Sequence, residues 1–196
     1  MSSNIMMENK PIITLLTDFG FSDPYVASMK GVILSICPKA TIIDITHQIP
    51  KFNIKTAAFV LMQTVKWFPP KTINVVVVDP GVGTSRRAII VEGKRHFYVG
   101  PDNGVLIPSA LREGIKNVYV IENRRFMLKE ISRTFHGRDI FAPTAAYLAS
   151  GFKPSDFGSK IEDYVRIKLR KAKRFGNTLS GEIIYVLSLI HISEPT

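Results

Sequence analysis

The chain has 196 residues, of which 45% are hydrophobic and 21% are charged, and its formal net charge is +10. This composition excludes an intrinsically disordered chain, which would lack the apolar side chains that offset the entropy of ordering, and the single cysteine, Cys37, excludes a disulfide-stabilised scaffold. The longest aliphatic stretch, residues 73–78, is far shorter than the roughly 20 residues that span a membrane, and residues 1–10 lack a signal-peptide pattern. We therefore expect a cytoplasmic protein with one domain, or one domain plus a fragment.

Strand and helix patterns alternate in the first half of the chain. Residues 11–17 and 41–46 are short apolar segments bounded by loop residues, which predicts buried strands. Residues 73–78 are nearly all valine, which predicts a strand covered on both faces. Helices are predicted between these strands, one beginning at Asp23-Pro24 with Asp23 as its N-cap, and one capped by Asn53.

The alternation continues in the second half. A hairpin is predicted over 88–99, a short helix over 104–112, a strand over 117–121 and a helix over 139–149. Alternation of this kind predicts an α/β domain with a largely parallel central sheet flanked by helices. In such sheets, ligands bind at the loops beyond the carboxyl ends of the strands.

A dense group of basic residues follows, with six cations among residues 166–174. Such a run can bind nucleic acid by neutralising phosphates. However, residues 165–170 alternate apolar and basic side chains, which predicts a half-buried strand with one solvated face. No aromatic residues lie between the cations to stack on bases, so the pattern favours the strand over a nucleic-acid site.

Two loops at predicted strand ends carry candidate site residues. In the segment 17–20, the Asp18 carboxylate can accept two hydrogen bonds, for instance from a ribose diol, or it can simply cap a turn. In the segment 79–87, Asp79 and Arg86 lie across a glycine turn that can fold them together over a bound water. That segment lacks the sequence fingerprints of a Walker loop and of a dinucleotide-binding loop. The alternative interpretation of the segment is a surface loop with an exposed ion pair that contributes under about 1 kcal/mol to stability.

Further along the chain, residues 101–104 form another glycine turn, and residues 134–139 place His136 just before a helix. A lone histidine is as readily structural as functional, so both interpretations of His136 stay open. His47 also ends a strand but has no comparable neighbours in sequence. No cluster of histidine and cysteine has zinc-ligand spacing, and no Gly-x-Ser-x-Gly nucleophile motif is present.

Five motifs occur together in order: Thr17–Gly20, Asp44–His47, Val78–Thr84, Pro101–Gly104 and Phe135–Asp139. On these motifs the chain resembles, over about residues 10–186, the S-adenosyl-L-methionine (SAM) hydroxide adenosyltransferase family, which comprises adenosine-forming SAM hydrolases related to fluorinating and chlorinating enzymes. The resemblance implies an α/β catalytic domain over 10–160, followed by a C-terminal β-barrel domain, and assembly as a homotrimer.

The resemblance also implies roles for individual residues. Asp79, Arg86 and His136 match the residues that hold and activate a water, and Asp18 matches the acid that binds the ribose hydroxyls. The halogenating relatives carry a tyrosine at the position of Asp79, which favours water over halide here. SAM is then a substrate, and neither a cofactor nor a metal is implied. The remaining substrate-binding positions implied are Asp23, near the methionine moiety, and Phe52, Phe135 and Gly137.

The implied chemistry is physically consistent. SAM carries a sulfonium, so methionine is already a good leaving group and the barrier lies in the nucleophile. Bulk water has a pKa near 15.7, so hydroxide is scarce at neutral pH. An arginine beside the water favours its anionic form, and a carboxylate or imidazole can accept the proton. Attack of a hydroxide-like water at C5′ cancels its negative charge against the positive charge of the sulfonium, so a pocket that excludes bulk water lowers the barrier.

The chain departs from the family pattern near its end. Residues 161–186 are expected to form a linker and the first strand of the barrel domain, and residues 187–196 resemble a non-native tail, with Leu187 where the family has Asp. Because the family's site forms between neighbouring subunits, we expect the 196-residue chain to be poorly active. Two alternatives remain: a non-catalytic protein that binds nucleosides or nucleic acid, and a halide-using 5′-halo-5′-deoxyadenosine synthase.

Overall fold

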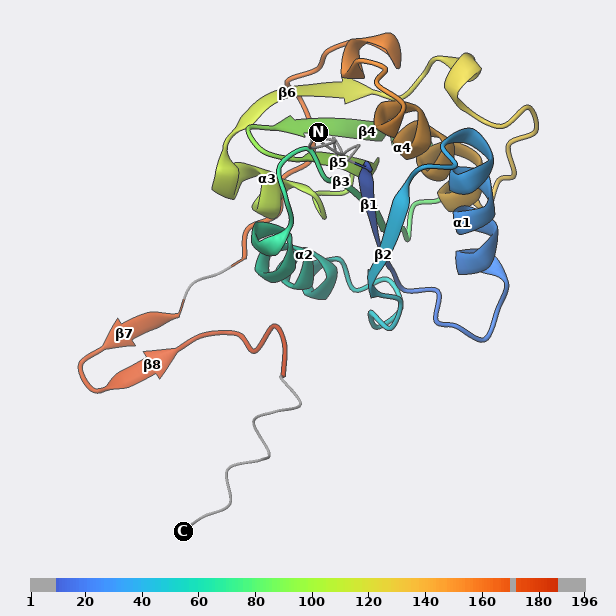
Figure 1. The fold of residues 1–196 in the computed structure, drawn as a ribbon. Coiled ribbons are helices and arrows are strands. Elements are labelled where there is room, and N and C mark those ends of the chain that lie inside the picture. Colours follow the sequence, from blue (N-terminus) through green and yellow to red (C-terminus); the bar gives the residue numbers. More distant parts are fainter. Residues whose placement is uncertain (1–9, 170–171, 187–196) are drawn as a thin grey trace, which may run out of the picture.

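The computed structural model describes residues 10–169 and 172–186, and its main feature is a six-stranded sheet with the order β2-β1-β3-β5-β4-β6 (Figure 1). The pairs β1–β2, β1–β3 and β3–β5 are parallel, whereas β4 is antiparallel to both β5 and β6. The expected largely parallel α/β sheet is therefore confirmed. The strands are β1 (Ile12–Thr17), β2 (Thr41–Thr46), β3 (Ile73–Val77), β4 (Ala88–Gly93), β5 (Phe97–Pro101) and β6 (Ile115–Val120).

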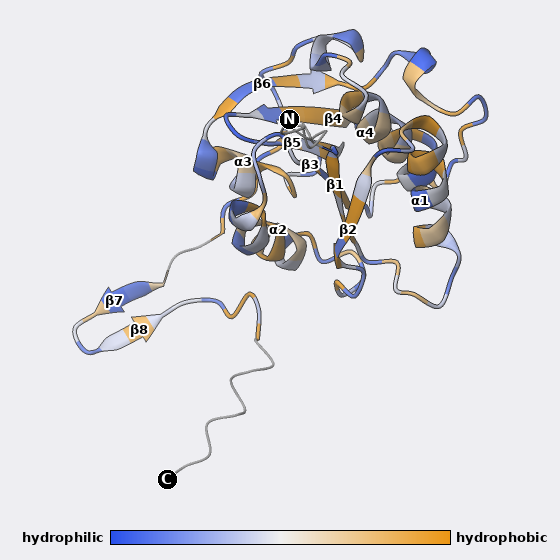
Figure 2. Ribbon diagram, viewed as in Figure 1, coloured by the Kyte–Doolittle hydropathy of each residue, from blue (hydrophilic) through white to orange (hydrophobic). Residues whose placement is uncertain are grey.

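Helices cover both faces of the sheet. α1 (Tyr25–Ile36) and α4 (Ala142–Ala149) pack on one face, and α2 (Ile54–Thr64) and α3 (Ile107–Glu113) pack on the other. Alternate residues of the valine-rich β3 enter the two cores, because successive side chains of a strand point to opposite faces. Figure 2 shows the apolar sheet strands enclosed between the helices. The short elements are the 3-10 turns η1 (Val65–Trp67), η2 (Arg124–Phe126) and η4 (Pro154–Asp156), and the π-helical turn η3 (Gly137–Phe141) directly before α4.

The order of the strands creates a switch point between β1 and β3. The chain leaves β1 through α1 to the edge strand β2, then returns through α2 on the opposite face to β3, on the other side of β1. The crevice beyond the carboxyl ends of two such strands is the usual ligand site of doubly wound sheets. Asp18 directly follows β1, and Asp79 comes two residues after β3.

Two local predictions about helix starts have different outcomes. Asn53 caps α2 as expected, since its side chain accepts a hydrogen bond of 3.0 Å from the Thr56 amide. The expected N-cap at Asp23 is wrong: α1 begins at Tyr25, Pro24 is its N-cap residue, and no side chain caps it. The Pro24 carbonyl instead accepts the first helical bond, from the Ser28 amide at 2.9 Å.

The half-buried strand expected over 165–170 is also wrong, since residues 165–169 form no strand. The Val165 amide donates to the Asp102 carboxylate at 2.8 Å instead of joining a sheet ladder. Ile167 packs directly over Gly104: a Cβ added to Gly104 would lie 2.6 Å from Cγ2 of Ile167. Side-chain contacts therefore hold this segment against the domain, and its apolar positions are used for docking rather than for a strand face.

The last described part of the chain forms a small hairpin of β7 (Lys173–Phe175) and β8 (Thr178–Ser180), drawn beside the domain in Figure 1. Residues 181–186 return to α2, where the Tyr185 and Phe59 rings lie 5.8 Å apart. The expected non-native tail, residues 187–196, lies outside the described residues. No helix in the described part of the chain has the length and apolar character needed to cross a membrane.

Candidate active site

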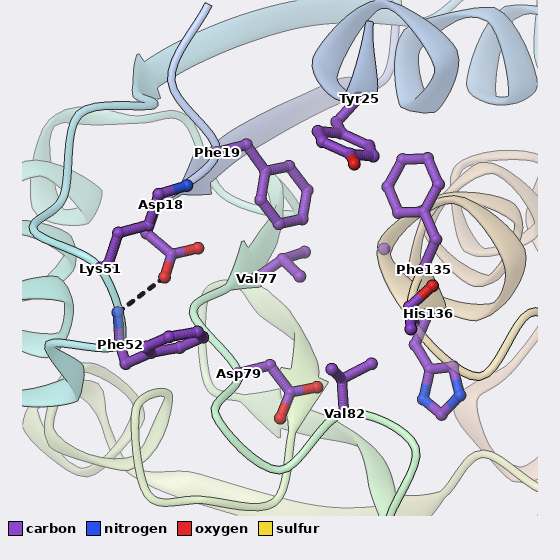
Figure 3. Close-up of a pocket in the computed structure, with 12 residues that line it drawn as sticks. Asp18, Phe19, Tyr25, Lys51, Phe52, Val77, Asp79, Val82, Phe135 and His136 are labelled. Atoms are coloured by element: carbon purple, nitrogen blue, oxygen red, sulfur yellow. Dashed lines mark hydrogen bonds between the residues drawn. The ribbon is translucent and has the colours of Figure 1, made fainter. Parts of the chain in front are cut away.

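A cavity of about 250 Å³ lies at the switch point between β1 and β3. Figure 3 shows Asp18 and Phe52 on one wall and Phe135 and His136 on the opposite wall. Four loops build it, namely those after β1, before α2, after β3 and before α4. A mostly apolar lining with a few polar groups is typical of small-molecule sites. The lining residues are Asp18, Phe19, Tyr25, Lys51, Phe52, Val77, Asp79, Val82, Thr134, Phe135, His136 and Gly137.

Arg86 joins Asp79 to His136. Its Nε lies 3.0 and 2.9 Å from the two Asp79 oxygens, and its Nη2 also donates to Asp79 Oδ2. The same Nη2 lies 2.9 Å from His136 Nδ1. The Asp79 and Arg86 side chains are only 4% and 11% exposed, so this ion pair is buried rather than the weak surface pair that the sequence left open. The structure thus brings together the three expected catalytic residues.

The contact with Arg86 determines which nitrogen of His136 carries a proton. A guanidinium only donates hydrogen bonds, so Nδ1 of His136 accepts and the proton of the neutral ring lies on Nε2. Burial lowers the pKa of His136 and the neighbouring Arg86 charge lowers it further, against the opposing charges of Asp79 and Asp139. His136 is therefore a neutral hydrogen-bond donor, through Nε2, at pH 7.

Glycines shape the loop that carries Asp79 and Arg86. Gly83 has φ +77°, a left-handed conformation, and a Cβ there would collide with the carbonyl oxygen of Arg133. The Gly81 amide donates to Asp79 Oδ1 at 3.2 Å. The loop can therefore pack tightly against the segment that leads to His136, which explains how residues 50 positions apart in sequence meet.

Asp18 occupies the opposite wall of the cavity. Its Oδ2 accepts a hydrogen bond of 2.8 Å from the Phe52 amide, and Phe52 adopts a left-handed backbone with φ 61° (Figure 3). Its Oδ1 makes no side-chain hydrogen bond with the described residues, which leaves that oxygen for a ligand. The structure does not bring Asp23 to this cavity: it is exposed on the loop before α1 and is not a lining residue.

Phe135 and Gly137, also expected at the site, line the cavity among aromatic rings. The Phe19, Tyr25 and Phe135 rings contact one another with centroid separations of 4.9–5.9 Å. Phe19 and Thr134 fall inside motifs noted in the sequence, and Val82 lies in the glycine loop, yet none had been assigned a role. Tyr25 and Lys51 were missed because nothing local marks them, and Val77 had been interpreted only as part of a strand.

The motif at 101–104 lies elsewhere and serves the fold. Asp102 Oδ2 accepts hydrogen bonds from Arg87 at 3.0 and 2.8 Å, and Arg87 also binds Asp163 at 2.9 Å. Asn103 donates to the Val78 carbonyl at 2.9 Å, at the end of β3. Among the described residues, no three histidine, cysteine, aspartate or glutamate side chains gather where they could hold a metal ion.

Comparison with known proteins identifies the family. Residues 13–158 match the family model of the SAM hydroxide adenosyltransferase N-terminal domain. The chain belongs to this family. The resemblance drawn from the five motifs is therefore confirmed.

Relatives within the SAM hydroxide adenosyltransferase family carry hydrolase names. The chain is 41% identical over 164 residues to an (R)-S-adenosyl-L-methionine hydrolase from Salinispora arenicola, covering 83% of this chain and 62% of the relative. It is 41% identical to one from Methanocaldococcus jannaschii, covering 87% and 66%. A fluorinase from an Actinoplanes species is more distant, at 27% identity over 89% of this chain and 65% of the relative.

A solved structure has the same fold. A crystal structure of an uncharacterised conserved protein from Thermotoga maritima superposes with a TM-score of 0.79 at 46% sequence identity, over 82% of this chain and 62% of that chain. The chain therefore spans less than two thirds of the length of both this protein and the Salinispora hydrolase.

Proposed function

We propose that this protein hydrolyses SAM to adenosine and L-methionine by attack of an activated water at C5′. The observation that carries the proposal is the buried Asp79–Arg86–His136 centre at the wall of an aromatic cavity. The hydrolase names of the relatives support it, as does the carboxylate at position 79, because a negative charge at that place disfavours a halide.

In the proposed mechanism, Arg86 and His136 hold the water. The contacts of the Arg86 guanidinium with Asp79, His136 and the Arg87 carbonyl leave one Nη1 hydrogen without a partner among the described residues. That hydrogen and the Nε2–H of His136 are donors suited to a water oxygen. The positive charge of Arg86 favours the hydroxide form of the water in this buried setting.

Asp79 takes the proton in this mechanism, because the Nδ1 lone pair of His136 is already occupied by Arg86. As the oxygen–C5′ bond forms, the C5′–sulfur bond breaks and its electron pair stays on sulfur, which gives neutral thioether methionine and adenosine. The reaction combines a hydroxide-like anion with a sulfonium, so the apolar cavity lowers the barrier by replacing bulk water around two charges that cancel.

The two walls of the cavity bind the substrate. The free oxygen of Asp18 accepts from the ribose hydroxyls, which fixes C5′ relative to the water. The faces of Phe135 and Tyr25 are suitable neighbours for the sulfonium, because aromatic rings attract cations. Asp23 is assigned in the same proposal to the methionine end of the substrate, outside the cavity described above.

We further propose that a C-terminal β-barrel domain of a neighbouring subunit covers this cavity in a homotrimer. Tyr25 and Phe52, which line the cavity, are 43% and 60% exposed, and Phe21, in the loop before α1, is 61% exposed. Exposed apolar rings of this kind suit a protein partner. In this proposal the catalytic domain spans residues 10–160, and residues 161–186 begin the barrel domain. The one cysteine, Cys37, is buried and free, which suits a reducing compartment such as the cytoplasm.

The test is product analysis. The protein carrying a complete C-terminal domain, and the 196-residue chain in parallel, are incubated with SAM in the presence and absence of chloride or fluoride, and products are separated by chromatography. Adenosine in both salt conditions is the expected product, with a much lower yield from the 196-residue chain. Halogenated adenosine, or no turnover by the longer protein, contradicts the proposal.

A further inference from the structure

His47 is completely buried beneath the loop that carries Asp18, and it does not line the cavity. Its Nδ1 lies 2.9 Å from the Thr17 hydroxyl, and its carbonyl accepts a hydrogen bond of 2.7 Å from the Gly20 amide. It therefore contacts the chain on both sides of Asp18. His47 has no comparable neighbours in the sequence, and only the fold places it beside Thr17.

The polar groups around His47 form a chain with a consistent direction. Its Nε2 lies 3.1 Å from Asp44 Oδ1, at ion-pair distance although not in the alignment of a good hydrogen bond. Burial alone would raise the pKa of Asp44, but the hydrogen bond from Lys30, at 2.6 Å, and the adjacent His47 ring hold that pKa below its ordinary value. Asp44 is therefore a carboxylate, and the ring tautomer with a proton on Nε2 of His47 places that hydrogen beside the negative charge.

The tautomer of the His47 ring determines the direction of its hydrogen bond with Thr17. With its proton on Nε2, His47 accepts the Thr17 hydroxyl hydrogen at Nδ1. The Thr17 oxygen also accepts a hydrogen bond from the Phe19 amide, at 3.2 Å. The residues immediately before and after Asp18 are thus bound into one network, which is buried at Thr17 and His47 and reaches the surface at Asp44 and Lys30.

We propose that His47 is a positioning residue for Asp18, acting through Thr17 and the Gly20 amide to aim the free carboxylate oxygen at the ribose hydroxyls. The proposal rests on the proposed function, since it assigns the ribose subsite of that reaction. The Phe52 amide also donates a hydrogen bond to Asp18, and this bond orients Oδ2. The backbone of the loop around Asp18 is held by the contacts with His47 and Thr17. The buried hydrogen bond between Thr17 and His47 restricts the loop, because breaking it would leave buried polar groups without a partner.

A matched pair of substitutions tests the proposal. Thr17→Val removes the hydroxyl while keeping the shape of the side chain, and Thr17→Ser keeps the hydroxyl. We expect Thr17→Val to weaken adenosine binding, measured by calorimetry, and to raise KM for SAM, each by about tenfold, with kcat changed less than about twofold. Thr17→Ser restores both values, and Thr64→Val, on α2 outside the site, serves as the threonine-to-valine control.

Substitution of His47 supplies an independent measurement. His47→Leu is expected to raise KM as Thr17→Val does, and the double variant to be little worse than either alone, because both changes break one network. If His47→Leu fails to fold, the Thr17 pair still decides. Equal adenosine affinity in Thr17→Val and the unsubstituted protein, or a fall in kcat with KM unchanged, overturns the positioning role. Absence of adenosine binding by the unsubstituted protein instead overturns the proposed function.

Discussion

Removal of the Arg86 guanidinium tests the water-activating centre most directly. In Arg86→Ala, the charge that favours hydroxide is lost from a place where the side chain is only 11% exposed. A unit charge about 4 Å from a developing anion contributes about 4 kcal/mol at an effective dielectric constant of 20. We therefore expect kcat to fall by about 10³-fold. Binding of SAM should change much less, because Arg86 contacts the water and not SAM in the proposed mechanism.

The assay separates chemistry from binding. Single-turnover formation of adenosine is followed by chromatography, and the affinity for SAM is measured separately by calorimetry. Arg86→Ala also leaves Asp79 buried without its partner, which costs about 3–5 kcal/mol of stability, so the measurements are made at low temperature on protein shown to be folded. Arg86→Lys keeps the charge but lacks the planar fork by which Nε and Nη2 both bind Asp79, and its kcat should fall by only about tenfold.

If Arg86→Ala and Arg86→Lys both lose SAM affinity and keep kcat, Arg86 binds substrate and does not activate water. A loss shared equally between affinity and kcat in Asp79→Ala would likewise remove the carboxylate from the role of proton acceptor.

Three further predictions concern stability and local order. Because burial lowers the pKa of His136 in the folded state, the unfolded chain binds more protons below pH 6.5. The thermal midpoint of unfolding should therefore fall as the pH is lowered from 7 to 5, and it should fall less in His136→Gln. An equal pH dependence of the midpoint in the two proteins contradicts this. Gly83→Ala should destabilise the fold by several kcal/mol in denaturant titrations, because its Cβ would collide with the Arg133 carbonyl oxygen. Gly151 also has a positive φ but no atom near the position of a Cβ, so Gly151→Ala should cost only about 1 kcal/mol. Equal costs for the two variants would show that the contact with Arg133 does not matter. Asp102→Ala removes the acceptor for Arg87 and for the docked segment, so amide exchange at Val165 should accelerate at least tenfold, and an unchanged rate would show that the clamp is dispensable.

The sequence by itself determined the layered α/β fold and the positions of two acids. Apolar periodicity is local information, so the strands at 11–17, 41–46 and 73–78 were predictable from a few neighbouring residues. The same segments end at Asp18 and Asp79, and placing these acids at strand ends required no knowledge of the strand order.

Local signals failed where distant residues compete for a group. The alternation at 165–170 predicted a strand, but the Val165 amide finds a better acceptor in Asp102, which is 63 residues earlier in the chain. Asp23 has the residue type of an N-cap, yet α1 begins two residues later, where no side chain caps it. His47 could not be assigned a role from the sequence, because Thr17 is 30 residues away and becomes its partner only when β1 and β2 pair.

Only the tertiary structure decided how the site is assembled. β3 returns to the far side of β1, and this places the ends of both strands on one cavity. The glycine loop then brings Arg86 between Asp79 and His136, and that contact fixes the ring nitrogen that carries the proton. Strand order and loop packing depend on the burial of two separate cores against the two faces of the sheet, which is a property of the whole chain and not of any segment.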